Sequence, residues 1–351
     1  MTEFPWYSKY PAGTLREIGP LSHTSLIDLF EDASKKFADR VAFENMGVKL
    51  TYREVDEKAT AFAAYLQSLG LRKGDRIAIQ MPNLLQFPIA FTGALKAGLI
   101  VVNTNPLYTP REMEYQFKDA GVSAIVILSN FAHHLAGIRD KVPAKHIIIT
   151  DMGDMLGTIK GSVINLVVKY LKKLVPPFHI PGALSFKTAL KLGASMSYQR
   201  PAVDVEDLAV LQYTGGTTGI AKGAQLSHRN IIAHNQMISE WFKPYLRADG
   251  KNIIITAIPM YHIFALTVNG TLMYSVGVKN VLITNPRDIP GFCKELTKHK
   301  FTIITGVNTL FNSLLNNPHF KNIDFSSLKG AVAGAMAVSY THLTLPTNRE
   351  V

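Results

Sequence analysis

Residues 211–223 read LQYTGGTTGIAKG and combine four glycines and three threonines with Lys222. Glycine lets the backbone turn tightly and lets a ligand approach it closely. Turned backbone N–H groups can form a nest for an anion, threonine hydroxyls add hydrogen bonds or a metal ligand, and lysine supplies a point charge that suits phosphate. An ordinary Gly/Thr-rich turn is the alternative. The combination, set between two apparent strands, favours a phosphate-binding loop.

This loop differs from the P-loop found in many nucleotide-binding proteins. The P-loop places a glycine five residues ahead of a Gly-Lys-Ser/Thr triplet, whereas Lys222 follows Ala221 here. The chemistry suggested by the residue types is therefore phosphate binding, but the motif belongs to another class.

The composition describes a globular protein that is large enough for two or more subdomains. Of the 351 residues, 47% are hydrophobic and 18% are charged, which argues against a disordered chain. The formal net charge of +11 suits anionic partners such as ATP, coenzyme A or acidic lipid. Nucleic acid is the weakest candidate partner, because no basic run is interleaved with aromatic residues.

Two further features indicate a cytoplasmic protein. The single Cys293 excludes an intramolecular disulfide and fits a protein of the reducing cytosol. We expect Cys293 to act as a small buried hydrophobic residue. The N-terminus has no signal-peptide pattern, and no uncharged apolar run is long enough to span a bilayer.

Short apolar strands alternate with amphipathic helices along most of the chain, which predicts an α/β fold with parallel sheets covered on both faces. The main helices are expected over residues 25–37, 51–70, 85–97, 110–120, 132–141, 228–242, 264–274, 289–298 and 308–316. Residues 185–203 are interpreted as an irregular connection. We divide the chain into a first α/β subdomain over residues 1–203, a second over residues 204–338 that carries the loop, and a tail over residues 339–351.

Residues 163–174, from Val163 to Leu174, place apolar side chains at helical spacing and lysines elsewhere. One interpretation is an interfacial helix that lies on anionic lipid, which would give peripheral contact with the cytoplasmic face of a membrane. The other, which we prefer, is a surface helix docked on its own domain with its lysines solvated.

At this point the chain resembles a known superfamily. Residues 213–223 look like the AMP-binding signature of the adenylate-forming enzymes, which include acyl-CoA synthetases, luciferases and peptide-synthetase adenylation domains. Further stretches are similar to bacterial long-chain fatty acid–CoA ligases, namely residues 102–112, 261–267, 283–291 and 304–311. The resemblance implies the large N-terminal domain of that fold, built from two βα-layered subdomains. It also implies an enzyme that joins a fatty acid to coenzyme A through an acyl-adenylate made from ATP.

The resemblance assigns roles to individual residues. The signature from Tyr213 onward would bind the nucleotide, and its loop would wrap the β- and γ-phosphates of ATP through Thr214, Gly215, Gly216, Thr217, Thr218 and Gly219. Thr214 would lie nearest Mg²⁺, and Lys222 would hold phosphate charge. His262 would stand where the carboxylate meets the acyl pocket. A turn of small residues, Gly334, Ala335 and Met336, would pack against adenine.

Each of these assignments has a plainer alternative. Lys222 could be a solvated lysine at a loop tip, and His262 could be an ordinary histidine at the edge of the core. Arg287 and Asp288 lie in a stretch typical of the subfamily, but the sequence gives Arg287 no physical role, and a capped helix start is the safer interpretation of Asp288.

The resemblance stops near Val338, and residues 339–351 look like an appended foreign tail. In the family, a Mg²⁺-binding glutamate, a ribose-binding aspartate and a small domain with a catalytic lysine would follow. We therefore expect this chain to be an N-terminal fragment with little or no turnover. Two other functions stay open: a different carboxylate-activating CoA ligase, and a non-catalytic nucleotide- or lipid-binding protein. Homodimerisation also stays open.

Overall fold

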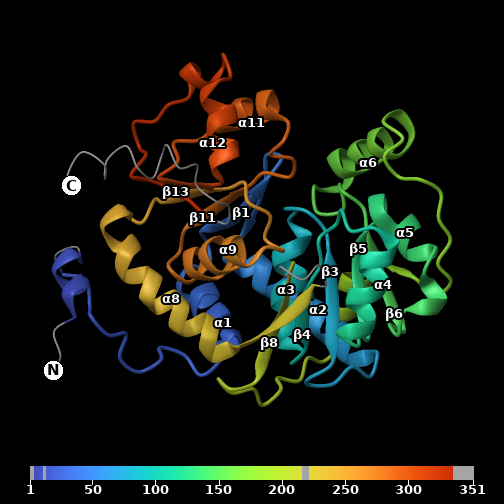
Figure 1. Cartoon of the computed structure of the whole chain (residues 1–351). Helices are drawn as coiled ribbons and strands as arrows, with labels where there is room; N and C mark the ends of the chain where they lie inside the picture. Colours follow the sequence, from blue (N-terminus) through green and yellow to red (C-terminus); the bar gives the residue numbers. More distant parts are fainter. Residues whose placement is uncertain (1–3, 11–12, 216–220, 335–351) are drawn as a thin grey trace.

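The structure of the chain is a computed structural model that describes residues 4–10, 13–215 and 221–334 (Figure 1). These residues form a six-stranded and a seven-stranded sheet with helices packed around both, which confirms the predicted α/β fold. The six-stranded sheet has the order β13 (Gly330–Ala333), β12 (Ile303–Gly306), β10 (Ile253–Thr256), β11 (Lys279–Leu282), β1 (Val41–Asn45) and β2 (Val48–Thr51).

The seven-stranded sheet has the order β7 (Leu184–Ser185), β6 (His146–Thr150), β5 (Ala124–Leu128), β3 (Arg76–Gln80), β4 (Ile100–Asn103), β8 (Leu208–Thr214) and β9 (Lys222–Ser227). Neighbouring strands in both sheets are parallel except at two edges, where β1–β2 and β8–β9 form antiparallel hairpins. The central strands are mostly apolar, and β5 is apolar along its whole length, because helices cover both faces of a parallel sheet.

The sheets do not follow the predicted division of the chain at residues 203 and 204. Strands β1 and β2, from the N-terminal part, join the six-stranded sheet because β1 pairs with β11. Strands β8 and β9, from the C-terminal part, join the seven-stranded sheet because β8 pairs with β4. The division therefore stays a prediction, and the two halves of the chain are interleaved in space.

The longer helices begin within one or two residues of the predicted starts, and most of them have the expected capping residue. They are α1 (Leu26–Lys36), α2 (Tyr52–Ser68), α3 (Gln86–Lys96), α4 (Pro110–Asp119), α8 (His228–Phe242), α11 (Ile289–Leu296) and α12 (Asn308–Leu315). Thr51 and Glu54 form the expected capping box at α2, and Ser25 and Ser227 cap α1 and α8. Cys293 is buried in α11, as expected for a small apolar residue.

Two predicted helices are broken in the structure. The helix expected over residues 132–141 ends early as α5 (Ala132–Ala136), and a 3₁₀ turn, η3 (Arg139–Lys141), follows Gly137. The helix expected over residues 264–274 consists of α9 (Ile263–Ala265), a π-helical segment η6 (Leu266–Leu272) and α10 (Met273–Ser275). The remaining 3₁₀ turns are η1 (Pro5–Lys9), η2 (Ser129–Phe131), η5 (Lys243–Tyr245) and η7 (Phe320–Asn322).

The prediction of an irregular connection over residues 185–203 was wrong, because this segment contains helix α7 (Phe186–Gly193). Ser185 caps α7 by accepting a hydrogen bond from the Thr188 N–H. The helix packs closely on α2, since a Cβ on Gly193 would lie 1.8 Å from the Ala61 carbonyl oxygen. Glycine at this crossing lets the two backbones approach each other.

The segment from Val163 to Leu174 is helical, as predicted, but most of the apolar side chains that we expected to dock are exposed, including Val163, Leu166, Tyr170, Leu171 and Leu174. It comprises part of α6 (Thr158–Leu166) and a π-helical segment η4 (Val167–Leu171) at the periphery of the molecule (Figure 1). Docking uses Gly161 and Val168 instead, which are buried. Within the described ranges, no helix combines the length and the apolar character needed to cross a membrane.

Candidate functional site

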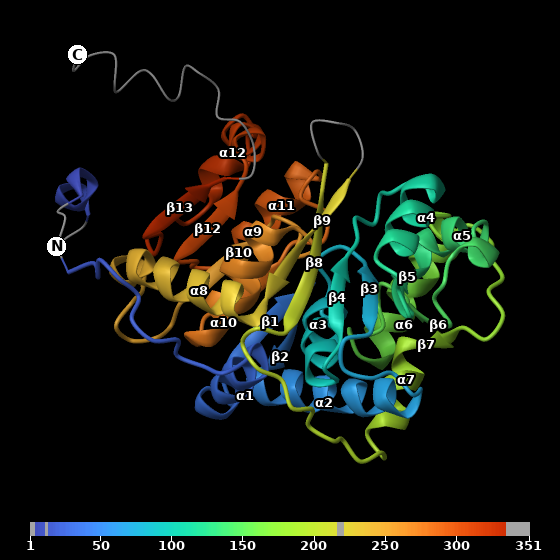
Figure 2. The same ribbon diagram turned by 60° about the horizontal axis from the view of Figure 1, so that its bottom comes forward.

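The β8–β9 hairpin carries the predicted phosphate loop at its tip (Figure 2). Thr214 is the last residue of β8 and pairs directly with Lys222, the first residue of β9. The two residues thus lie opposite each other at the base of the loop, and both are exposed. Gly216, Thr217, Thr218 and Gly219 lie outside the described residues. A Cβ added to Gly215 would meet no atom within 4 Å, so its backbone borders open space.

Tyr213 anchors the hairpin. Its side chain is buried, and its hydroxyl donates a hydrogen bond to the Asp119 carboxylate at the end of α4. Burial, and then this hydrogen bond, raise the pKa of the Tyr213 phenol well above its usual value. The ring lies over Gly223, where a Cβ would come within 3.0 Å of it. The side chain of Tyr213 therefore fixes the strand to α4.

A cavity of about 740 Å³ adjoins the base of the loop. It is lined by α4, by the segment before α4 and by the residues on either side of the predicted loop. The lining residues are Tyr108, Arg111, Glu112, Tyr115, Gln116, Gly215 and Ala221. The Tyr115 hydroxyl donates to the Ala221 carbonyl oxygen at 3.0 Å and thereby ties α4 to the hairpin. The Glu112 carboxylate is occupied by the Thr109 capping box, which lowers its pKa. Arg111 remains as an exposed cation beside this space.

A chain of buried amides connects α4 to the loop that carries His262. Gln116 Nε2 donates to the Asn103 carbonyl oxygen at 3.0 Å, and Asn103 Nδ2 donates to Gln212 Oε1 at 3.0 Å. Gln212 Nε2 then donates to the Tyr261 carbonyl oxygen at 3.2 Å. Because Gln212 lies on β8, this chain positions the His262 loop against the strand that leads into the phosphate loop. These residues were not predicted from the sequence, although amides such as Asn103 and Gln212 in mostly apolar strands were a usable signal.

His262 is half-buried and caps α9. Its Nδ1 accepts a hydrogen bond from the Phe264 N–H at 3.3 Å, and burial lowers the pKa of the imidazole. The ring is therefore neutral near pH 7 and carries its proton on Nε2. A neutral N–H donor at this position can hydrogen-bond a carboxylate or phosphate oxygen without holding a full charge.

Asn83 fixes the backbone just before His262. Its Nδ2 donates to the carbonyl oxygens of Thr256 at 2.9 Å and Ile258 at 3.0 Å, and its Oδ1 accepts from the Met260 N–H at 2.8 Å. Asn83 follows β3 in the seven-stranded sheet, whereas its partners lie at the end of β10 in the six-stranded sheet and in the segment after it. One side chain thus bridges the two sheets beside the candidate site.

The predicted adenine-binding turn is only partly described. Gly334 follows β13, and its N–H donates to the Gly306 carbonyl oxygen at 3.2 Å. A Cβ on Gly334 would lie 3.5 Å from the Phe264 ring, which places this turn against the first residues after His262. Ala335 and Met336 lie outside the described residues.

The metal prediction rests on Thr214 alone. In the part of the chain that the structure describes, no group of three or more His, Cys, Asp or Glu side chains is arranged to hold a metal ion.

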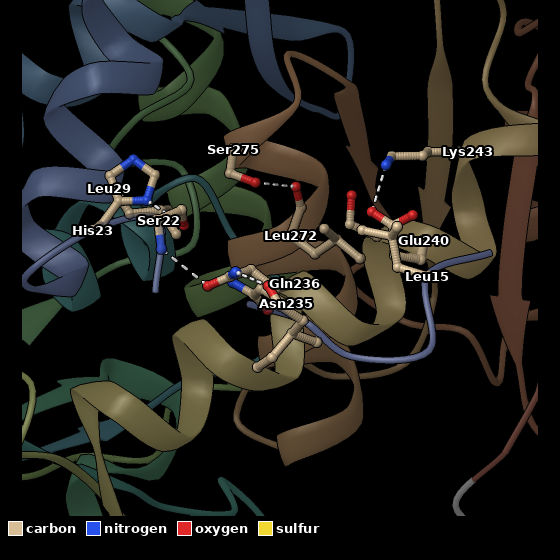
Figure 3. Close-up of a pocket in the computed structure, with 12 residues that line it drawn as sticks. Leu15, Ser22, His23, Leu29, Asn235, Gln236, Glu240, Lys243, Leu272 and Ser275 are labelled. Carbon is tan, nitrogen blue, oxygen red and sulfur yellow. Dashed lines mark hydrogen bonds and ion pairs between the residues drawn. The ribbon is translucent and has the colours of Figure 1, made fainter. Parts of the chain in front are cut away.

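A second cavity, of about 250 Å³, lies beneath the N-terminal segment (Figure 3). Gln236 of α8 holds this segment, because its Nε2 donates to the Ile18 and Pro20 carbonyl oxygens, each at 3.1 Å. Its Oε1 also accepts from the Ser22 N–H at 3.0 Å. The described lining residues include no member of the predicted site, so we assign this cavity to packing of the N-terminal segment.

Comparison with known proteins identifies relatives over nearly the whole chain. The family model described as AMP-binding enzyme matches residues 30–344. A long-chain-fatty-acid–CoA ligase of Escherichia coli O6:H1 is 56% identical over 334 residues, which cover 95% of this chain and 59% of the relative. A long-chain-fatty-acid–CoA ligase of Haemophilus influenzae is 51% identical over 342 residues, covering 97% and 61%. The chain thus spans about three fifths of the length of these relatives.

Solved structures with the same fold have low sequence identity. An anthranilate CoA ligase in complex with anthranoyl-AMP superposes with a TM-score of 0.75 at 22% identity, covering 91% of this chain and 56% of the other. A long-chain-fatty-acid–CoA ligase from Archaeoglobus fulgidus gives a TM-score of 0.74 at 22% identity, covering 95% and 61%. These matches support the fold.

Proposed function

We propose, because the chain belongs to the family of AMP-binding enzymes, that it forms the ATP- and fatty-acid-binding part of a long-chain fatty acid–CoA ligase. The observation that carries this proposal is the hairpin that sets Thr214 beside Lys222 and is tied through Gln212 to the loop of His262. This arrangement would set the proposed phosphate-binding groups on the hairpin that also contacts the loop of His262, the proposed donor to the carboxylate. The names of the relatives supply the substrate class.

The reaction that this arrangement would serve has two steps. The fatty acid carboxylate attacks the α-phosphorus of ATP, an acyl-adenylate forms and pyrophosphate leaves. The thiol of coenzyme A then attacks the acyl carbon and releases AMP. Such chemistry depends mainly on positioning and on neutralisation of phosphate charge.

The residues of this chain divide these tasks. Thr214 and the backbone of Gly215 would bind phosphate oxygens, and Lys222 would neutralise charge on the departing pyrophosphate. His262 would hold the carboxylate through its Nε2–H. A bound Mg²⁺ ion would supply further charge neutralisation, with the Thr214 hydroxyl as its ligand from the protein.

Replacing Lys222 with alanine should weaken ATP binding by about tenfold or more, because a charged contact to phosphate is lost. The thermal midpoint should stay unchanged, since Lys222 is exposed. Calorimetric titration of ATP into the 351-residue chain, with a thermal melt of each variant, measures both quantities. Lys49→Ala is the matched control, because Lys49 is also an exposed lysine on an edge hairpin. Equal ATP affinity in Lys222→Ala and parent would contradict the assignment.

We also propose that α6 and η4 contact anionic lipid from the cytosol. Their outward side chains are strongly exposed, with Ile159 at 84% and Leu171 at 77%. Val163, Leu166, Tyr170 and Leu174 extend the same apolar surface. Lys169, Lys172 and Lys173 are exposed beside it. Apolar side chains flanked by lysines match a helix that lies in a membrane interface, where each lysine adds about 1 kcal/mol near an anionic surface.

Changing Lys169, Lys172 and Lys173 together to glutamate should abolish flotation of the chain with vesicles of mixed phosphatidylcholine and phosphatidylserine. Leu171→Ser should weaken flotation without changing charge, because it removes an exposed apolar contact. Unchanged flotation of the triple variant would contradict lipid contact. The alternative partner for this apolar surface is a second copy of the chain, and sedimentation of the parent without vesicles detects such self-association.

A further inference from the structure

Arg287 lies in the loop between β11 and α11, which the proposed mechanism does not use. The loop is well fixed: Thr284 Oγ1 donates to the Asn83 carbonyl oxygen at 2.9 Å, and the Asn285 side chain accepts from the Arg287 N–H at 3.2 Å. Asp288 caps α11 by accepting from the Gly291 N–H at 3.1 Å, which confirms the predicted helix start. The backbone therefore holds Arg287 at a defined place.

The guanidinium group of Arg287 has no acidic partner among the described residues. The neighbouring Asp288 carboxylate is occupied by its capping hydrogen bond. Arg287 is exposed, so its charge is available to a ligand that reaches it from solvent. A rigidly held, unpaired arginine suits a carboxylate, which it can bind through two parallel hydrogen bonds.

Beside Arg287 is a cavity of about 460 Å³ at the carboxyl ends of β10, β11 and β12. Its wall is mostly apolar and includes Ile258, Pro259, Val307 and Leu310. A crevice outside the carboxyl ends of parallel strands is the usual ligand position in α/β folds, and this volume is typical of ligand pockets. One free cation at the rim of an apolar cavity matches a ligand with an anionic head and an apolar chain.

We propose that Arg287 binds the carboxylate of a long-chain fatty acid whose chain occupies this cavity. Arg287 and the cavity then form a reception site, where the free acid binds beside the adenylation site. The choice of ligand rests on the proposed function. The cavity shares the backbone segment that leads from Ile258 and Pro259 to His262. Arg287 also acts electrostatically on Tyr261: burial raises the pKa of the Tyr261 phenol, and the arginine charge opposes that rise. Arg287 is thus a substrate-recognition residue next to the His262 loop.

The test uses the fluorescent C18 acid cis-parinarate and its uncharged methyl ester, titrated into the 351-residue chain. Arg287→Gln should weaken acid binding by about fivefold, the effect of one charged contact at an exposed rim, and leave ester binding unchanged. Arg287→Lys should restore part of the acid affinity. Lys294→Gln is the matched control, because Lys294 is exposed on α11 and does not line the cavity.

A second variant tests the cavity itself. Ser313 lies on α12 at the lining, and Ser313→Trp should fill the space and weaken binding of both acid and ester. Thermal melts establish that each variant is folded. Unchanged acid affinity in Arg287→Gln, or equal losses for acid and ester, would overturn the role of Arg287.

The same samples separate this inference from the proposed function. If the parent binds ATP in a Lys222-dependent manner but binds no cis-parinarate, the reception site is wrong and the nucleotide site stands. If the parent binds neither ATP nor cis-parinarate, the proposed function fails and the reception site fails with it.

Discussion

Asn83→Ala is expected to lower the free energy of unfolding by about 3–5 kcal/mol. The side chain is 1% exposed and makes three hydrogen bonds to backbone groups of the segment before His262. Removing it leaves the Ile258 carbonyl oxygen and the Met260 N–H without a partner, whereas the Thr256 carbonyl oxygen keeps its bond from the Ile283 N–H. Each buried polar group left unpaired costs about 1–3 kcal/mol, and the packing of the buried side chain is lost as well. Partial replacement by water keeps the total below the sum of the maxima.

Urea unfolding of parent and variant measures this loss. Asn83→Asp is the sharper test, because it keeps the acceptor for Met260 N–H but turns an oxygen toward the carbonyl groups of Thr256 and Ile258. Asn83→Asp should lower the free energy of unfolding at least as much as Asn83→Ala does. Asn316→Ala controls for the loss of an exposed amide on the surface of the chain and should change stability by about 0.5 kcal/mol or less. A loss under about 1 kcal/mol in Asn83→Ala would show that the bridge between the sheets contributes little.

Local patterns predicted the elements of this fold well where one short stretch contains all the determinants. The capping box of Thr51 and Glu54 is an example, since both partners lie within one turn. The β8–β9 hairpin is another, because the glycines and the flanking strand residues are contiguous. Helix α7 was missed although Ser185 caps it, because apolar positions in so short a helix give a weak periodic signal.

The arrangement of the sheets could not be predicted in the same way. The pairing of β1 with β11 joins residues more than two hundred positions apart, as Phe43 opposite Asn280 shows. Asn83 likewise contacts Thr256, 173 positions away. Local periodicity carries no information on such pairs, which depend on complementary surfaces formed only in the folded chain.

The candidate site shows the same division. The sequence indicated Thr214 and Lys222, and the structure adds that they face each other across the hairpin. The structure also shows that the Tyr213 hydroxyl donates a hydrogen bond to the Asp119 carboxylate, a partner that the family resemblance did not predict. The amides of Asn103 and Gln212 were overlooked because each follows a run of apolar residues near the end of its strand. Their role depends on each other and on partners from two other segments, α4 and the His262 loop.

Acidification should remove about 3 kcal/mol of stability through His228. Its Nδ1 accepts a hydrogen bond from the Leu26 N–H at 2.9 Å, which satisfies a buried donor in the first turn of α1. Burial lowers the pKa of the imidazole from 6.5 to about 4, although Asp207 and Asp204 oppose the shift and Lys73 adds to it. The unfolded chain takes up this proton near pH 6.5, whereas the folded chain resists it down to about pH 4. The contribution is therefore complete above pH 6.5 and is lost as the pH falls toward 4.

Urea unfolding at about pH 7 and about pH 4 measures this effect. Other groups titrate over the same range, so the relevant quantity is the difference between the parent and His228→Gln, which keeps an acceptor for the Leu26 N–H but cannot be protonated. The parent should lose about 3 kcal/mol more than the variant on acidification, as the difference between the two pKa values requires. His319→Gln, which removes an exposed histidine, should behave like the parent. If His228→Gln and the parent lose the same stability, the pKa of the imidazole is the same in the folded and the unfolded chain, and burial and the hydrogen bond from Leu26 do not keep the folded imidazole neutral.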